Sequence, residues 1–275
     1  MFQDHGAYLK WREKKFDTHP GSIDELIVEV DDLENLSMAE HEAIMDRIAR
    51  ANMAIYVSRN PLPDLKRFAR QFGLENLDAN WLSGEDGISR IEVTEGGKGY
   101  IPYTNKPIKW HTDGYYNPPE RKIRAMLLHC AQSAADGGEN RLMDHEMLYC
   151  LLRDQNPGYI EALSRPDAMK IPERTDENEV ARKEETGPVF SFDEQDHLHM
   201  RYTARTRSIE WKQDPLTLAA VSALESILAF PSPYIFRTRL ESGMGLICNN
   251  VLHDRSGFEG SDRLLFRARY YDRIR

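Results

Sequence analysis

Apolar residues recur with a helical period in several segments of the chain. The clearest are "LSMAEHEAIMDRIARANM", "PDLKRFARQFG", "DHEMLYCLLRDQ", "PGYIEALS" and "DPLTLAAVSALESILAF". Ser37 and Glu40 have the spacing of a capping box at the start of the first segment. In the second, Asp64 stands at the N-cap position and Gly73 just beyond the C-cap. We therefore predict a helix in each of these segments.

Shorter apolar runs, many with alternating polar positions, predict strands. They include "AIYVS", "ISRIEV", "IRAMLLHCA", "NRLMD", "PVFSFD", "LHMRYTARTR", "YIFRTRL", "GLICNN" and "RLLFRARYYD". These runs do not alternate regularly with the helices, so the pattern favours a mainly β fold with flanking helices, on a sandwich, barrel or jelly-roll core. Because no linker interrupts the pattern, we expect one domain over residues 1–275.

Residues 164–187, "SRPDAMKIPERTDENEVARKEETG", differ from the rest of the chain. The stretch is highly charged and poor in large apolar side chains, so we do not expect it to order itself around a core. An irregular excursion of this length is uncommon in a compact domain unless it has a function. We interpret it as a charged surface loop, which is either a lid over the functional site or an insertion without a role.

The composition excludes several classes of protein. A net charge of −9 argues against a nucleic-acid partner. No window reaches the roughly 18 apolar residues of a membrane span, and the N-terminus lacks the apolar segment of a signal peptide. Cys130, Cys150 and Cys248 lie far apart, which indicates buried thiols and no zinc or disulfide framework. We expect a cytoplasmic protein that does not bind membranes, and the oligomeric state stays open.

A histidine and an aspartate stand two residues apart in "KWHTDGYYNP". Side chains at positions i and i+2 of a strand point to one face, so His111 and Asp113 can converge. Buried polar groups that converge need a partner, which is a metal ion, a proton relay or an ordinary hydrogen bond. "GLICNNVLHDRSGF" places His253 after an apolar strand, and two histidines with one carboxylate form the facial triad of non-haem iron oxygenases.

The C-terminal segment is positively charged, although the chain as a whole is negatively charged. In "RLLFRARYYDRIR", Arg263, Arg267 and Arg269 share one face of the predicted strand, and apolar residues share the other. The arginine face is either a solvated sheet edge or an anion pocket, because arginine pairs with carboxylates through two parallel hydrogen bonds. A 2-oxo dicarboxylic acid would suit such a pocket.

Taken together, "YTNKPIKWHTD", "MLLHC", "DGGENRLMD", "NNVLHDRSGF" and "RLLFRAR" resemble the ordered motifs of the taurine dioxygenase (TauD/TfdA) superfamily. The resemblance covers residues 35–272 and is closest to the γ-butyrobetaine and trimethyllysine hydroxylase branch. It implies a double-stranded β-helix (jelly roll) that uses Fe(II), 2-oxoglutarate and O2. It also implies hydroxylation of an unactivated C–H bond in a small polar metabolite, such as an amino acid, betaine or sulfonate, with release of succinate and CO2.

The same resemblance assigns roles to individual residues. The positions that match the iron ligands are His111, Asp113 and His253. Arg267 matches the arginine that binds the distal carboxylate of 2-oxoglutarate, and Arg263 matches a second arginine that is the main one in the γ-butyrobetaine branch. Asn140 stands where many relatives have a threonine or serine in contact with 2-oxoglutarate, and its amide can also donate a hydrogen bond.

Residues of the substrate site follow from the resemblance as well. Tyr103 matches a residue of an aromatic cage, and Asn105 belongs to the same motif. Tyr115 and Tyr116 directly follow the iron-ligand motif, so we expect them in the wall of the pocket. Arg269 stands where the branch has another cage aromatic, which argues against a quaternary ammonium substrate.

Two other interpretations stay open. In "DHLHM", His197 and His199 share a strand face as in a cupin metal site, although "RYTARTR" lacks the glutamate that a cupin needs. A non-catalytic jelly-roll binding module would keep the strands without the ligands and arginines. Of the other histidines, we expect His129 in the core and His145 near a helix start.

Overall fold

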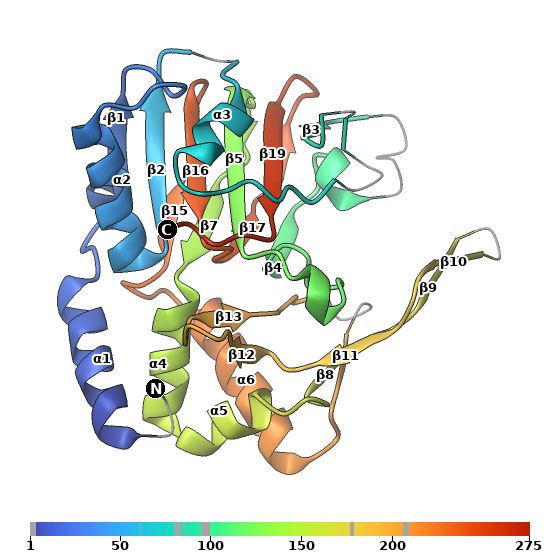
Figure 1. Cartoon of the computed structure of the whole chain (residues 1–275). Coiled ribbons are helices and arrows are strands. Elements are labelled where there is room, and N and C mark those ends of the chain that lie inside the picture. Colours follow the sequence, from blue (N-terminus) through green and yellow to red (C-terminus); the bar gives the residue numbers. More distant parts are fainter. Residues whose placement is uncertain are drawn as a thin grey trace. The chain divides into compact units, whose positions relative to one another are not determined.

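A computed structural model describes residues 4–60, 62–79, 83–84, 86–94, 100–176, 179–205 and 209–275 (Figure 1). The chain forms two compact units, each of which combines segments that lie far apart in the sequence. Unit 1 consists of Met1–Thr18, Lys109–Lys122 and Met143–Ile235. Unit 2 consists of His19–Ile108, Ile123–Leu142 and Phe236–Arg275. The single domain over residues 1–275 stays a prediction.

Unit 2 contains a large sheet made from the predicted apolar strands. Its strand order is β1 (Ile27–Val30), β2 (Met53–Ser58), β16 (Met244–Cys248), β5 (Ala125–Gln132), β19 (Leu264–Tyr270) and β3 (Ser89–Glu92). β1 and β2 are parallel, and the other neighbouring pairs are antiparallel. Figure 1 shows strands from the start, middle and end of the sequence side by side in this sheet.

Helices α2 (Met38–Ala51) and α3 (Leu65–Arg70) cover one face of the large sheet (Figure 1). Both predicted N-caps are confirmed. Ser37 and Glu40 form a complete capping box, and the Asp64 carboxylate accepts from two backbone N–H groups of the first helical turn. The core on this face includes Ile44, Ile48, Tyr56, Phe68, Leu127, Ile247, Ala268 and Tyr270.

The opposite face of the large sheet packs against a shorter sheet of the same unit. There β7 (Asn140–Met143) lies between β15 (Phe236–Thr238) and β17 (Leu252–Arg255). The core between the sheets includes Met126, Leu128, Leu142, Phe236, Leu246, Val251 and Leu265. Two sheets over one apolar core, with helices outside, confirm the predicted mainly β fold on a jelly-roll core.

Strand β19 separates its side chains as the alternation of its sequence predicts. Arg267 and Arg269 lie opposite Leu128 and Met126 of β5, whose side chains line the core between the sheets. Ala268, between the two arginines, belongs to the core under the helices. Because β19 lies between β5 and β3, it is not an edge strand, so a solvated sheet edge does not explain its arginines.

Unit 1 is built from helices and short antiparallel strands (Figure 1). Its helices are α1 (His5–Thr18), α4 (His145–Gln155), α5 (Pro157–Leu163) and α6 (Pro215–Ala229). Its paired strands are β8 (Met169–Ile171) with β11 (Glu185–Gly187) and β14 (Glu210–Trp211), β9 (Arg174–Asp176) with β10 (Glu179–Arg182), and β12 (Phe190–Phe192) with β13 (Leu198–Met200). The sequence predicted the last three helices but not α1. None of the helices in the described part of the chain combines the length and apolarity that a bilayer-spanning helix needs.

The charged stretch 164–187 is not the irregular excursion that its composition predicted. Its described residues, 164–176 and 179–187, contain four strands, and β8 and β11 pair in antiparallel register. Met169 and Ile171, two residues apart on β8, are fully buried on one face. Two apolar side chains with strand spacing, together with Ala168, therefore anchor a stretch whose average composition is polar. Its role as a lid stays a prediction.

Candidate active site

His111 and Asp113 stand at and just beyond the end of β4 (Ile108–His111), in unit 1. The residue between them is held by two hydrogen bonds. Thr112 donates its backbone N–H to the Tyr202 carbonyl at 3.0 Å, and the Tyr202 N–H donates to the Thr112 hydroxyl at 3.1 Å. The glycine after Asp113 has a φ of 68°, which turns the chain at once. Paired backbone and a tight turn thus fix both side chains.

The ring of His111 is fixed in one tautomer. Its Nδ1 lies 2.9 Å from the Lys109 carbonyl, which can only accept, so Nδ1 carries the proton and Nε2 keeps its lone pair. Nε2 lies 3.6 Å from Oδ1 of Asp113, which is too long for a hydrogen bond. An ion about 2.1 Å from each atom could bridge any separation up to about 4.2 Å. The pair therefore has the geometry of two ligands of one metal ion.

The His253 ring in unit 2 is also held in one tautomer by a backbone carbonyl. Every residue of β17 is buried, and His253 is 7% exposed. Its Nδ1 lies 3.0 Å from the Val251 carbonyl, so Nδ1 donates and Nε2 is the basic nitrogen. A backbone carbonyl that binds the far nitrogen of a histidine is the usual support of a metal-ligating imidazole. Both predicted ligand histidines thus have this support from the residue two positions earlier.

Strand β17 is tied to β7 directly after His253. The Asp254 carboxylate accepts from the Arg141 backbone N–H at 3.0 Å and from the Arg141 Nε at 2.9 Å. Asn140 donates its amide Nδ2 to the Asp254 carbonyl at 2.8 Å. Asn140 is 5% exposed, and this bond leaves one N–H of its amide for a ligand.

Arg263 is a buried cation in unit 2, only 6% exposed. Its guanidinium carbon lies 5.2 Å from the centre of the Phe258 ring, a cation–π distance. Among the residues that the structure describes, no carboxylate forms an ion pair with it and no acceptor binds its guanidinium. Burial lowers the pKa of Arg263 to about 10, which still leaves it charged at neutral pH. A buried charge without a counter-ion is unfavourable, so this site is suited to an anionic ligand.

Arg255 is a second buried cation, and no sequence pattern pointed to it. Its Nη2 donates to the carbonyls of Thr104 at 2.8 Å and Lys106 at 2.6 Å, and its Nη1 to that of Pro102 at 3.4 Å. Burial and the charge of Arg263 lower the pKa of Arg255 to about 9. Arg255 therefore holds the segment with the predicted substrate residues, and adds positive charge beside Arg263.

The two arginines of β19 differ from Arg263, which stands just before that strand. Arg267 is half-buried and faces the core between the sheets. Arg269 is fully buried, and its Nη2 lies 2.5 Å from Asp78, a carboxylate that also accepts from the Tyr271 hydroxyl. Arg269 is thus part of an internal ion pair, and its predicted contact with the substrate stays a prediction.

The predicted substrate residues lie in both units. In unit 2, Tyr103 is fully buried, and Asn105 is exposed with its carbonyl accepting from the Phe258 N–H at 3.1 Å. In unit 1, the rings of Tyr115 and Tyr116 meet edge to face with centres 5.1 Å apart. The structure thus brings the two neighbouring tyrosines together directly after the His111–Asp113 pair.

The histidines of the cupin interpretation have other surroundings. The His197 side chain is 43% exposed, and its Nδ1 lies 3.1 Å from Asp193. His199 stands opposite Ser191 in the β12–β13 pair. Within the described ranges, no group of three potential metal ligands includes either histidine. The structure therefore gives the cupin interpretation no support.

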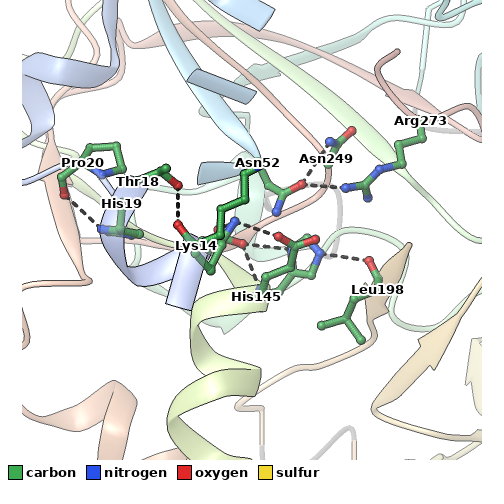
Figure 2. A network of polar contacts seen from close by, with 12 residues as sticks. Lys14, Thr18, His19, Pro20, Asn52, His145, Leu198, Asn249 and Arg273 are labelled. Carbon is green, nitrogen blue, oxygen red and sulfur yellow. Dashed lines mark hydrogen bonds and ion pairs between the residues drawn. The ribbon is translucent and has the colours of Figure 1, made fainter. Parts of the chain in front are cut away.

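Two further histidines are structural, as predicted. His129 is fully buried, stacks on Tyr56 and lies 3.2 Å from the hydroxyl of that tyrosine. His145 is the first residue of α4, and its Nε2 lies 3.1 Å from the Leu198 carbonyl (Figure 2).

Comparison with known proteins adds a family and several relatives. Residues 19–269 match the model of the family described as taurine catabolism dioxygenase TauD, TfdA family. A uridine-5′-phosphate dioxygenase from Amycolatopsis sp is 29% identical over 232 residues, which cover 82% of this chain and 79% of that protein.

Solved structures show the same fold. An asparagine oxygenase with Fe(II), 2S,3S-3-hydroxyasparagine and succinate matches with a TM-score of 0.60 at 13% identity, over 89% of this chain and 93% of that one. The non-haem iron oxygenase OrfP with Fe and α-ketoglutaric acid matches with a TM-score of 0.63 at 16% identity, over 86% of this chain and 80% of that one. At these identities the similarity supports the jelly-roll architecture.

Proposed function

The chain belongs to the TauD/TfdA family and is a 2-oxoglutarate-dependent non-haem iron dioxygenase, and from this premise we propose that His111, Asp113 and His253 bind its Fe(II). The observation that carries this proposal is that a backbone carbonyl orients each of the two histidine rings in the same way. Each Nδ1 donates to a backbone carbonyl, which leaves Nε2 as the ligand atom. Two neutral imidazoles and one carboxylate suit Fe(II) and leave three coordination positions open.

When bound, Fe(II) and 2-oxoglutarate supply the oxidant that inserts oxygen into a C–H bond and leave succinate and CO2. The residues of this chain orient and enclose the reactants. The Lys109 and Val251 carbonyls hold the two imidazole rings, and the glycine turn after Asp113 holds its carboxylate. Burial of the ligand side chains excludes water from their surroundings.

We propose that Arg263 is the principal partner of the distal carboxylate of 2-oxoglutarate. It is a buried guanidinium for which no counter-ion exists among the described residues. Arg255 strengthens the positive potential, but its Nη1 and Nη2 already donate to backbone carbonyls. Arg267 assists from the inner face of β19, and Asn140 contributes the remaining N–H of its amide.

Arg263→Ala is expected to weaken 2-oxoglutarate binding about a hundredfold, because a bidentate charge-assisted pair is lost. Arg267→Ala is expected to weaken it by about tenfold or less. Anaerobic calorimetric titration of the Fe(II) protein with 2-oxoglutarate measures both. Arg237→Ala is the matched control, since Arg237 lies exposed on β15 of the same unit. If Arg263→Ala binds like the control while Arg267→Ala loses binding, Arg267 is the main anchor.

We propose that the primary substrate is a small polar metabolite and that the product is its hydroxylated form. The named relatives act on uridine-5′-phosphate or carry oxidised asparagine, and OrfP has been solved with L-Arg. Arg269 and its ion pair with Asp78 argue against a cage for a quaternary ammonium group at that position. Assignment to the γ-butyrobetaine branch therefore stays a prediction.

Two measurements test the proposed function. Addition of 2-oxoglutarate to the anaerobic Fe(II) protein is expected to give a visible charge-transfer band, which a non-catalytic binding module would not give. Succinate formation is then screened with uridine-5′-phosphate, L-asparagine, L-arginine, betaines and sulfonates as primary substrates. If the band is absent and no compound gives succinate, the oxygenase assignment for this chain is contradicted.

A further inference from the structure

Arg201 stands between β13 and the residues that hold the His111–Asp113 segment. Its guanidinium uses all three nitrogens on main-chain carbonyls of unit 1. Nε donates to Tyr115 at 2.7 Å, Nη1 to Met169 at 3.2 Å and Nη2 to Glu185 at 2.8 Å. Among the described residues, no carboxylate forms an ion pair with this arginine. Burial disfavours the charge of Arg201, which is held by three main-chain carbonyls and by the nearby negative charge of Glu185. A buried cation bonded in this way points to a role beyond surface solvation.

The three carbonyls belong to three segments that lie far apart in the sequence. Tyr115 stands two residues after Asp113. Met169 and Glu185 belong to β8 and β11, the antiparallel pair of the charged stretch 164–187. Arg201 therefore joins the segment that follows the proposed iron ligands to the strands that the sequence suggested as a lid.

A second contact reinforces this connection. The guanidinium carbon of Arg182, at the end of β10, lies 5.8 Å from the centre of the Tyr116 ring, and its Nη2 donates to the Pro172 carbonyl at 2.5 Å. The two tyrosines are thus linked to the charged stretch at two points, once through the Tyr115 backbone and once through the Tyr116 ring.

The geometry assigns Arg201 the role of a positioning residue for the substrate site, which it builds by fixing Tyr115 and Tyr116 against β8 and β11. This inference rests on the proposed function, because the tyrosines matter only if substrate binds beside the iron ligands. Only arginine can do this, because its planar fork reaches three separate acceptors at once. Lysine keeps the charge but concentrates its donors on one atom.

Hydrogen exchange in the absence of ligands tests the connection itself. In Arg201→Met and Arg201→Lys, peptides that cover residues 112–117, 169–171 and 185–187 are expected to exchange at least about tenfold faster than in the wild type. Arg165→Lys is the matched control, since Arg165 is an exposed arginine of the same unit whose side chain makes one long contact, 3.4 Å to Asp214. Faster exchange confined to residues 169–187, or no change at all, would overturn the inference.

Kinetics then separate positioning from simple support of the fold. With the compound found in the succinate screen, Arg201→Lys is expected to raise the KM for that compound about tenfold. The KM for 2-oxoglutarate and the Fe(II) content should stay at the wild-type values, because Arg201 touches neither group. An unchanged substrate KM together with faster exchange at 112–117 would contradict a positioning role. If the wild type makes no succinate, the proposed function fails, and the exchange experiment alone decides whether Arg201 joins these segments.

Discussion

Replacement of His111, Asp113 or His253 by alanine is expected to reduce succinate formation to the background rate and leave the fold intact. Each change removes one of three ligands, and the remaining pair cannot hold Fe(II) in the geometry that catalysis needs. The Nδ1 of each ring donates to a carbonyl only two residues away in the chain, so loss of either ring should disturb little beyond the site. Metal content, succinate formation and thermal unfolding of each variant measure the three parts of this expectation.

Controls for the ligand assignment come from the chain itself. His197→Ala and His199→Ala remove the histidines of the cupin interpretation, and both are expected to keep iron and activity. His197 is well exposed and bonded to Asp193, so its removal should leave the fold unchanged. Retention of iron and full turnover in His253→Ala would exclude that residue from the site. Loss of iron in His197→Ala would favour the cupin site instead.

The parts of the site that the sequence predicted are those that depend on local spacing. His111 and Asp113 stand two residues apart, at and just beyond the end of β4, and their side chains meet. The alternation of strand side chains places Arg267 on the inner face of β19. The caps at Ser37 and Asp64 follow from local hydrogen bonds within one helical turn. In each case the partners lie within a few residues, so a single sequence contains the whole signal.

The parts that the sequence did not predict depend on tertiary contacts with the main chain. Arg201 and Arg255 each bind carbonyls of three residues, and a carbonyl is the same in every amino acid. Neither their spacing nor their residue type distinguishes them from surface arginines. Helix α1 was missed for a related reason, because its buried residues are Tyr8 and the cation Lys15 and no apolar stripe marks it.

Lys15 leads to the prediction with the largest expected effect on stability. It is 5% exposed on α1, and its Nζ lies 2.5 Å from Asp144 and 2.7 Å from Glu146. Asp144 is fully buried and is the N-cap of α4, where it accepts from the Glu146 N–H at 2.9 Å. The next residue, His145, binds the carbonyl of Leu198 on β13, so the cluster supports the strand that leads to Arg201 (Figure 2).

Lys15→Met is expected to lower the free energy of unfolding by about 3–5 kcal/mol, because it leaves a buried carboxylate without its cation. Lys15→Met with Asp144→Asn should recover most of this loss, since asparagine removes the charge and keeps the N-cap acceptor. Urea unfolding followed by circular dichroism measures all three proteins. Lys14→Met is the matched control, because the neighbouring lysine is exposed on the same helix.

The same cluster predicts how stability depends on pH. Burial raises the pKa of the Asp144 carboxyl, but the charges of Lys15 and His145 outweigh burial and hold it at about 2. In the unfolded chain this pKa is about 3.9, so the contribution of Asp144 is complete above about pH 4 and is lost as the pH falls toward 2. Burial alone would lower the pKa of Lys15, yet the two carboxylates beside it raise this pKa above the ordinary value. The contribution of Lys15 to stability is therefore lost only at strongly alkaline pH.

The wild type should lose about 2 kcal/mol more of its free energy of unfolding than the double variant between pH 4 and 2. Equal acid sensitivity of the two proteins, or a Lys15→Met variant as stable as Lys14→Met, would show that the buried pair does not hold α1 to α4.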